Sequence, residues 1–175
     1  MTPTRHGAVT LREAGPADLG ILLDIVHRAY RAEGGWTTEA HLVAGARADA
    51  DEIREAITDQ VHLLLVAERD GAVVGCCYTA LHEDGRGAEL GLFAVDPDVQ
   101  GGGIGRALLE EQARRRAAQG LEILDLRVLD SRPELAAWYA RCGFADVGRP
   151  VPFAGNAADL KVPGLGMRVM VRPLL

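Results

Sequence analysis

The sequence contains few of the residues that mark secreted, metal-binding or membrane proteins. It has only three cysteines, Cys76, Cys77 and Cys142, and neighbours such as the first two cannot form an ordinary disulfide bridge. It has no Cys-x-x-Cys pair and no two histidines at metal-ligand spacing, so we expect no metal site. It also lacks an apolar run long enough to span a bilayer, and residues 1–9 lack the apolar segment of a secretory signal. These absences predict a reduced, cytoplasmic protein with no membrane partner.

The chain also has no excess of basic residues. Its 19 Lys and Arg against 25 Asp and Glu give a formal net charge of −6. A nucleic-acid-binding surface needs a basic stripe, so we do not expect nucleic acid as a partner. With 175 residues, of which 48% are hydrophobic and 25% charged, the chain has ordinary globular composition and suits one core. We therefore expect a single domain over residues 1–175.

The first part of the chain predicts a short strand, helices and an antiparallel meander. Val9–Arg12 has the pattern of a strand. A helix then begins at Pro16, and Asp49–Thr58 has the apolar spacing of another. Asp70-Gly71 is typical of a hairpin turn. Together with a second polar turn it predicts three antiparallel strands, which are Val61–Glu68, Ala72–Leu81 and Ala88–Val95.

The second part predicts a parallel crossover. Asp96-Pro97 stops the third meander strand, and a helix runs from Ile104 to about Gln119 before the strand Leu121–Leu129. A strand–helix–strand crossover makes its two strands parallel, so the expected fold is α/β with a mixed sheet. A further helix, two strands and a proline-containing loop follow, at Pro133–Gly143, Phe144–Gly148, Met167–Val171 and Pro150–Gly164.

The most informative stretch is the glycine loop, residues 100–106, between a predicted strand and a predicted helix. Its glycines let the backbone approach a ligand closely, and the helix start offers unpaired N–H groups and a positive dipole end. That combination binds phosphates. The dinucleotide fingerprint and the P-loop both fail, but Gln/Arg-x-x-Gly-x-Gly/Ala is met by Gln100, Gly103 and Gly105. A connecting loop without a ligand is the alternative interpretation of three adjacent glycines alone.

With its flanks, this loop resembles that of the GNAT acetyltransferases, which holds the pyrophosphate of acetyl-CoA. Residues 92–97 look like the family's strand and stop before the loop, and residues 136–144 look like its later helix with a Gly-Phe ending. The resemblance implies a GNAT-like fold, with an antiparallel meander followed by a parallel crossover and C-terminal strands. It implies acetyl-CoA as co-substrate and transfer of an acetyl group to a primary amine by direct attack in a ternary complex.

The resemblance also implies site residues. Those expected to bind the co-substrate, mostly through backbone, are Phe93, Val95, Gln100, Gly101, Gly103, Ile104, Gly105 and Arg106. Tyr139 aligns with the family's acid for the leaving thiolate, although it also lies in an ordinary apolar helix stripe. Glu89 is the candidate base, with a solvated edge carboxylate as the alternative. The family's CoA-contacting asparagine is replaced by Arg132, which we expect to face water rather than a phosphate.

The acceptor end is less specific. Trp36 and Glu39 are candidate residues for an amine pocket, through a ring face and a carboxylate, with helix packing and capping as the alternative. The stretch Gly35–Glu39, with the later Gly45-x-Arg47, looks like one branch of the family and names no acceptor, so a small molecule and a peptide stay open. The resemblance also implies that the last strand or a sheet edge could serve a homodimer.

Three other functions fit parts of the sequence. The first keeps the fold without catalysis, as a module that binds acyl-CoA and regulates a partner. The second transfers a longer acyl chain, and the third binds a nucleotide phosphate on a Rossmann-like sheet, which the failed fingerprint and the meander oppose. A covalent acetyl-cysteine on Cys76 or Cys77 would need a nearby activating base, for which His62 and His82 are the candidates.

Overall fold

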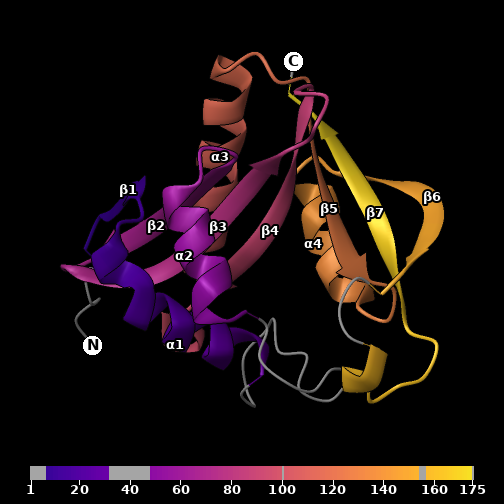
Figure 1. Cartoon of the computed structure of the whole chain (residues 1–175), viewed down its shortest axis with the longest axis horizontal. Coiled ribbons are helices and arrows are strands. Elements are labelled where there is room, and N and C mark those ends of the chain that lie inside the picture. Colours follow the sequence, from indigo (N-terminus) through magenta and orange to yellow (C-terminus); the bar gives the residue numbers. More distant parts are fainter. Residues whose placement is uncertain (1–6, 32–47, 100, 154–156, 175) are drawn as a thin grey trace, which may run out of the picture.

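The structure is a computed structural model that describes residues 7–31, 48–99, 101–153 and 157–174 (Figure 1). Its strands form one sheet in the order β1-β2-β3-β4-β5-β7-β6. The strands are β1 (Val9–Glu13), β2 (His62–Arg69), β3 (Ala72–Leu81), β4 (Gly87–Val95), β5 (Ile123–Leu129), β6 (Ala145–Pro152) and β7 (Gly166–Pro173). The α-helices are α1 (Leu19–Tyr30), α2 (Ala50–Thr58), α3 (Ile104–Ala118) and α4 (Pro133–Arg141), and three short 3-10 helices are η1 (Pro16–Asp18), η2 (Pro97–Val99) and η3 (Ala157–Asp159).

The expected meander and crossover are both present. β1 to β4 pair antiparallel in sequence order, and the β2–β3 hairpin turns at Asp70 and Gly71, whose φ angles are 53° and 80°. β4 and β5 are parallel and are connected through α3, and β7 lies antiparallel between β5 and β6. The mixed α/β fold class is therefore confirmed.

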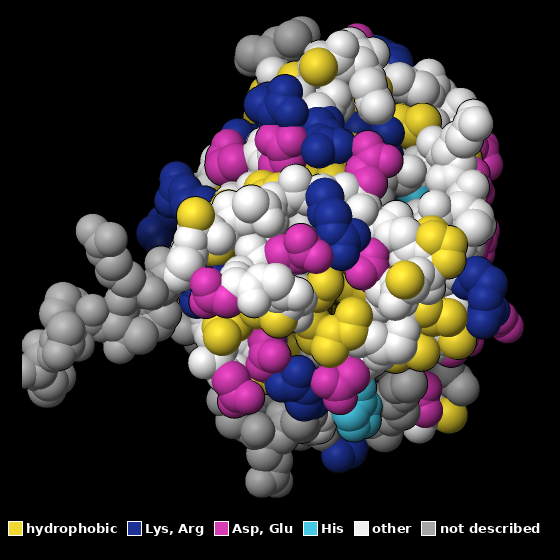
Figure 2. All heavy atoms as spheres, turned by 90° about the vertical axis from the view of Figure 1, so that its left-hand side faces the viewer, with side chains coloured by type: hydrophobic (Ala, Val, Ile, Leu, Met, Phe, Trp, Pro, Cys, Tyr) yellow, Lys and Arg dark blue, Asp and Glu magenta, His cyan; other side chains and the backbone are white. Residues whose placement is uncertain are grey.

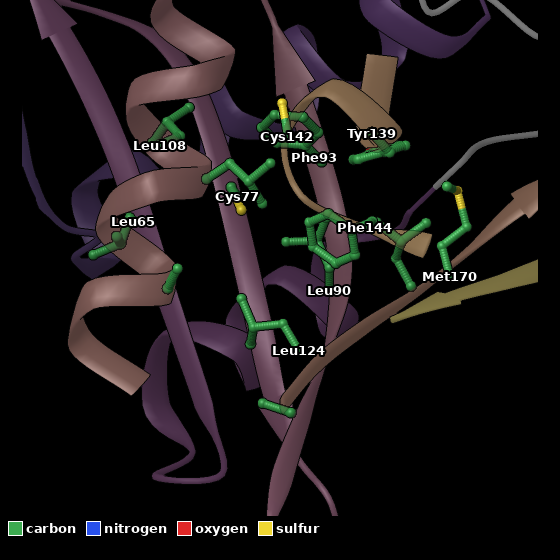
Figure 3. Packing of buried hydrophobic residues seen from close by; sticks show 14 of the residues in the cluster. Leu65, Cys77, Leu90, Phe93, Leu108, Leu124, Tyr139, Cys142, Phe144 and Met170 are labelled. Atoms are coloured by element: carbon green, nitrogen blue, oxygen red, sulfur yellow. The ribbon is translucent and has the colours of Figure 1, made fainter. Parts of the chain in front are cut away.

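Helices cover both faces of the sheet. On one face, α1 and α2 bury residues of alternate sheet positions, among them Leu64, Val66 and Cys76. On the other, α3 and α4 pack over the intervening residues, including Leu65 and Cys77 (Figure 3). This alternation follows from the period of two along a strand. It places the neighbouring cysteines Cys76 and Cys77 in different cores, and both are buried.

A buried polar cluster fixes α3 to the sheet. Arg116, which is 2% exposed, donates from Nε to the Thr79 hydroxyl at 2.8 Å and from Nη2 to the carbonyls of Thr79 and Val61 at 2.8 and 3.1 Å. Gln112 accepts from the Thr79 hydroxyl and donates to the carbonyls of Leu63 and Cys77. Burial lowers the pKa of the Arg116 guanidinium. Hydrogen bonds from α3 therefore satisfy carbonyls of two adjacent strands.

The last strands differ from the prediction. β6 continues to Pro152, whereas the sequence predicted a strand that ends at Gly148 and a loop from Pro150. Both prolines fall on the edge strand, which pairs only with β7, and an edge strand needs no N–H on its outer side. Helix formation also begins later than expected at the first helix, because Pro16 opens η1 and α1 follows at Leu19.

The surface near β1 carries charges of both signs. Figure 2, which views the β1 side, shows acidic and basic side chains interspersed with small apolar patches. On β1 itself, Arg12 forms ion pairs with Asp18 and with Glu68, at 2.8 Å each. Within the described ranges, no helix is both long and apolar enough to cross a membrane.

Candidate active site

The glycine loop forms the start of α3. Gly103 is the residue before the helix and has a φ of 75°, a left-handed conformation that favours glycine. Among the described residues no side chain caps this helix, and its first intrahelical bond runs from the Ala107 N–H to the Gly103 carbonyl. The N–H groups of Ile104, Gly105 and Arg106 are thus those that a helix leaves without an intrahelical acceptor. These N–H groups make the start of α3 suitable for binding an anion, as the sequence predicts.

A cavity of about 630 Å³ opens at this helix start. It lies between the end of β4, the start of α3 and one side of α4. Its lining residues are Phe93, Ala94, Val95, Gly101, Gly103, Ile104, Gly105, Arg106, Leu135, Trp138 and Arg141. One ligand could therefore contact the strand, the glycine loop and the later helix together, although these elements are far apart in sequence.

The cavity exists because β4 and β5 separate. Their parallel pairing has three residue pairs and ends at Glu89↔Asp125. Beyond that point the two ribbons diverge, and α4 lies behind the opening in Figure 1. Phe93 and Val95, near the end of β4, line the space beyond the last pair.

Aromatic side chains form one wall. The rings of Phe93 and Trp138 stack with centroids 5.8 Å apart and planes at 29°. A Cβ atom on Gly105 would lie 3.3 Å from the Phe93 ring and 3.8 Å from the Trp138 ring. Glycine at this position lets α3 approach both rings closely.

Two arginines provide positive charge at the cavity. Arg106 lies in the first turn of α3 and Arg141 in the last turn of α4, and both are exposed and line the cavity. Neither forms a salt bridge within the part of the chain that the structure describes. Most other arginines of that part are paired with carboxylates, as Arg172 is with Glu110 at 2.9 Å. The cavity therefore combines a helix N-terminus with two cationic side chains, which suits an anionic ligand such as a phosphate.

Helix α1 holds the strand wall of the cavity in place. The Tyr30 hydroxyl donates to the Phe93 carbonyl at 2.6 Å. Two residues earlier in α1, Arg28 makes a two-pronged ion pair with Asp96, which follows β4, at 2.7 and 2.9 Å. The Arg28 guanidinium lowers the pKa of the Asp96 carboxyl.

Comparison with known proteins identifies the family. Residues 60–146 match the family model described as an acetyltransferase (GNAT) domain. The chain belongs to the GNAT superfamily. The match covers β2 to the start of β6, and so includes the glycine loop and every element that lines the cavity.

Individual relatives agree with this assignment. The chain is 36% identical over 98 residues to a mycothiol acetyltransferase of Propionibacterium freudenreichii, which covers 55% of this chain and 31% of that protein. It is 31% identical over 150 residues to an amino-acid acetyltransferase of Pseudomonas fluorescens, over 81% of this chain and 31% of that one. This GNAT chain thus spans about a third of the length of these curated relatives.

The fold is also that of solved structures. The ribosomal-protein-S18-alanine N-acetyltransferase from Escherichia coli superposes with a TM-score of 0.75 at 23% identity, over 95% of this chain and 94% of that one. A likeness at this identity concerns the fold alone.

The structure brings most of the predicted co-substrate residues of this GNAT chain together. Seven of the eight line the cavity, and these are Phe93, Val95, Gly101, Gly103, Ile104, Gly105 and Arg106. The eighth, Gln100, lies outside the described residues, and so do the two acceptor candidates Trp36 and Glu39.

The two catalytic candidates lie near the cavity but do not line it. Tyr139 is 6% exposed, and its ring lies 5.1 Å from Trp138 and 6.3 Å from Phe93, centroid to centroid. Figure 3 shows it among the core residues beside Phe93. Glu89 lies on β4 at the last pair with β5, where its side chain is 40% exposed and its carboxylate is 3.6 Å from Arg127 Nε. Both catalytic roles stay predictions.

Arg132 corrects one expectation. The sequence placed it in water, but its side chain is 4% exposed and donates to the Glu134 carboxylate at 2.6 Å. The residue precedes α4, so the ion pair joins the residue before the helix to its first turn.

Sequence reasoning also missed residues of the cavity. Leu135, Trp138 and Arg141 follow the spacing of three residues that places side chains on one face of a helix, and this spacing was the available signal. Ala94 was missed as well, because a strand's alternation predicts that it points away from Phe93.

Proposed function

We propose that this chain transfers an acetyl group from acetyl-CoA to a primary amine, by direct attack of the amine in a ternary complex. The observation that carries this proposal is the cavity at the start of α3, which combines helix N–H groups without intrahelical acceptors, an apolar wall and two arginines that form no salt bridge among the described residues. This is the composition that a ligand with a phosphate end and an extended, less polar arm requires.

The residues present fit acetyl-CoA. The N–H groups at the start of α3, with Arg106 and Arg141, would hold its phosphates. The end of β4 at Phe93 and Val95 would lie along its pantetheine arm, next to the Trp138 ring. When bound, acetyl-CoA supplies a thioester as acyl donor. Every other part of the reaction falls to side chains and backbone of this chain.

The reaction requires a neutral amine, a donor for the developing oxyanion and a proton for the departing sulfur. The amine nitrogen forms a bond to the acyl carbon while the carbon–sulfur bond breaks. Glu89 takes the proton that the attacking nitrogen loses, directly or through water. Tyr139, beside the cavity wall, returns a proton to the thiolate. The co-substrate and the acceptor are bound at the same time, so no acyl group rests on the protein.

The buried cysteines support direct attack over a covalent route. Burial raises the pKa of the Cys76 thiol to about 12 and that of Cys77 well above its usual value. Thiolates, and not thiols, are the nucleophiles. Neither cysteine lines the cavity, so an acetyl-cysteine intermediate has no support in the geometry.

The names of relatives suggest which acceptors to test. Those similar to this chain are called mycothiol, amino-acid and ribosomal-protein-S18-alanine acetyltransferases, and a further fold neighbour is a spermidine/spermine N-acetyltransferase from Vibrio cholerae. We infer that the acceptor of this chain is also an amine, of a small molecule or of a peptide.

One observation favours a second function, binding of acyl-CoA without turnover. Tyr139 is buried behind Phe93 and Trp138 and does not line the cavity. A tyrosine held away from the sulfur would leave the cavity able to bind the ligand and unable to complete the reaction. Release of free thiol in the presence of an amine separates the two functions.

The test is calorimetric titration of acetyl-CoA into wild-type protein and into Gly105→Glu. Residue 105 lies in the first turn of α3 with ordinary helical backbone, and a Cβ there would lie 3.3 Å from Phe93. A glutamate would place bulk and negative charge in the cavity, so we expect saturable binding by wild type and none by the variant. Gly20→Glu in α1 is the matched control, because nothing lies within 4 Å of its Cβ position.

Position 105 is a better probe than position 103, where the left-handed φ would strain any other residue. If wild type binds no acetyl-CoA, the proposed function is wrong. If Gly105→Glu and Gly20→Glu bind equally well, the ligand lies elsewhere.

A further inference from the structure

A group of titratable side chains lies where β4 and β5 separate. Glu89 and Asp125 are the last pair of the parallel register, so they are adjacent across the two strands. Side chains at paired positions lie on the same face of a sheet. Two carboxylates are therefore held side by side at the edge of the opening that leads to the cavity.

Both carboxylates project to the face opposite α3. Their strand neighbours Ala88, Leu90, Leu124 and Leu126 belong to the core cluster under α3 and α4. The alternation of a strand directs Glu89 and Asp125 to the other side. The cavity and the carboxylate pair thus lie on opposite sides of the fork between β4 and β5.

His82 reaches this pair across β4. A Cβ atom on Gly87, the first residue of β4, would lie 2.9 Å from His82 Nδ1. The absence of a side chain at Gly87 lets the imidazole lie over the strand. Its Nε2 is 2.9 Å from Asp125 Oδ2 on β5. Side-chain exposure is 17% for Asp125 and 30% for His82, so the histidine is the more accessible member of the pair.

The charges around Asp125 come from β4, from β5 and from the turn after β3. Burial raises its pKa, and the charge of Glu89 on β4 raises it further, whereas His82 after β3 and Arg127 on β5 act to lower it. Its partner on β7 is Val171, which carries no charge. Asp125 therefore responds to the protonation of both Glu89 and His82.

We propose that Glu89 and Asp125 act as a coupled carboxylate pair that takes up the proton of the attacking amine, and that His82 passes this proton to solvent. The proposal rests on the proposed function. An N–H bond of the acceptor ammonium breaks, an O–H bond forms on the carboxylate pair, and the neutral amine remains. This proton then moves through the His82 imidazole to water, which restores the pair, so that Glu89 can take the second proton that the nitrogen loses as it attacks. Glu89 is the member of the pair that meets the amine, and Asp125 and His82 act on the proton only after Glu89 has taken it up.

The first measurement is the titration of Asp125, followed by carbon-13 NMR of its carboxyl group in the whole protein. Glu89→Gln removes a negative neighbour, so the Asp125 midpoint moves to lower pH. His82→Gln removes a group that favours the charged carboxylate, so the midpoint moves to higher pH. Glu122→Gln, an exposed carboxylate that pairs with Arg86, is the control and leaves it unchanged. If the Asp125 midpoint moves in neither Glu89→Gln nor His82→Gln, the proposal of a coupled pair is wrong.

The second measurement is the pH profile of thiol release from acetyl-CoA with a panel of primary amines that includes L-alaninamide and spermidine. Asp125→Asn and His82→Gln each lower kcat by roughly 10²-fold near neutral pH, the usual contribution of a proton-transfer group. Acetyl-CoA affinity is unchanged, and the loss shrinks as pH rises and the free amine becomes abundant. A uniform loss at every pH, or none, overturns the role in proton uptake.

The two measurements separate the proposals. Absence of thiol release by wild type with every amine overturns the proposed function, and with it the role in proton uptake, while NMR still reports whether the pair is coupled. If wild type releases thiol but the Asp125 midpoint responds to neither the Glu89 nor the His82 variant, only the proposed coupled pair is wrong and the proposed function stands.

Discussion

Replacement of the two cavity arginines should weaken acetyl-CoA binding by a defined amount. Arg106 and Arg141 line the cavity from α3 and α4 and form no salt bridge among the described residues, so no competing carboxylate has to be displaced when a phosphate binds. A hydrogen bond to a charged group contributes about 1.5–3 kcal/mol. Because both side chains are exposed, we take the lower end of that range, which corresponds to roughly tenfold in Kd.

The assay is titration of acetyl-CoA into Arg106→Gln, Arg141→Gln and the double variant. Each single change should raise Kd by roughly tenfold, and the double change by roughly 100-fold if the two act independently. Since screening by salt weakens exposed charge pairs, the difference from wild type should shrink between about 0.05 and 0.5 M salt. Arg149→Gln, on the exposed edge strand β6 and away from the cavity, is the matched control and should bind like wild type.

Two results would refute this reasoning. A change in Kd below twofold in both single variants would mean that the phosphates lie away from the arginines. An equal loss in Arg149→Gln would mean that net charge, rather than contact in the cavity, determines affinity.

Three further variants test the scaffold and the acid. Asp96→Asn breaks the two-pronged pair with Arg28 and should destabilise the fold by about 1–3 kcal/mol in urea unfolding at pH 7; because Arg28 lowers the folded pKa of Asp96, the difference from wild type should vanish as pH falls through that pKa. Arg116→Met leaves the carbonyl of Thr79 without its donor and should cost roughly 2–4 kcal/mol, measured in the same way, and unchanged stability would exclude a structural role for the cluster. Tyr139→Phe should lower kcat at least about tenfold with unchanged acetyl-CoA affinity, whereas unchanged kcat would exclude it as the acid.

Local signals in the sequence predicted much of the fold. The Asp70-Gly71 turn occurs where the two expected strands meet, because its positive φ angles match a two-residue hairpin. Asp96-Pro97 ends β4 as expected, and α3 begins within the glycine loop, at Ile104. These features depend on a few adjacent residues, and tertiary context did not override them.

Features that depend on distant residues were not predictable in the same way. The position of β7 between β5 and β6 depends on which strand completes the sheet beside β5, and no local pattern encodes it. Pro150 and Pro152 were read as loop residues because proline is excluded from central strands, but β6 is an edge strand. The burial of Arg132 accompanies its ion pair with Glu134 in the first turn of α4, and no pattern in the sequence indicates that pair.

The site itself was predictable only on the glycine-loop side. A helix N-terminus with glycines is encoded in adjacent residues, and five residues of that stretch line the cavity, namely Gly101, Gly103, Ile104, Gly105 and Arg106. The pairing of His82 with Asp125 joins residues 43 positions apart, through contact over Gly87, and no sequence spacing indicates it. Predicting which residues of two strands lie close together requires the strand order and the pairing register, and the sequence alone gives neither.

A break in alternation along β4 places side chains of one strand on opposite faces of the sheet. Ala88 and Leu90 point into the core under α3, but so does Phe93, while Leu92 and Ala94 face α1. The switch coincides with the irregular register opposite Cys77 and Thr79, as a β-bulge produces. Glu89 and Phe93, which regular alternation would place on one face, therefore point to opposite faces. Under the proposed function, the carboxylate acts on the acceptor from one side while the cavity holds the acyl donor on the other, and the attacking amine has only to enter the fork between β4 and β5.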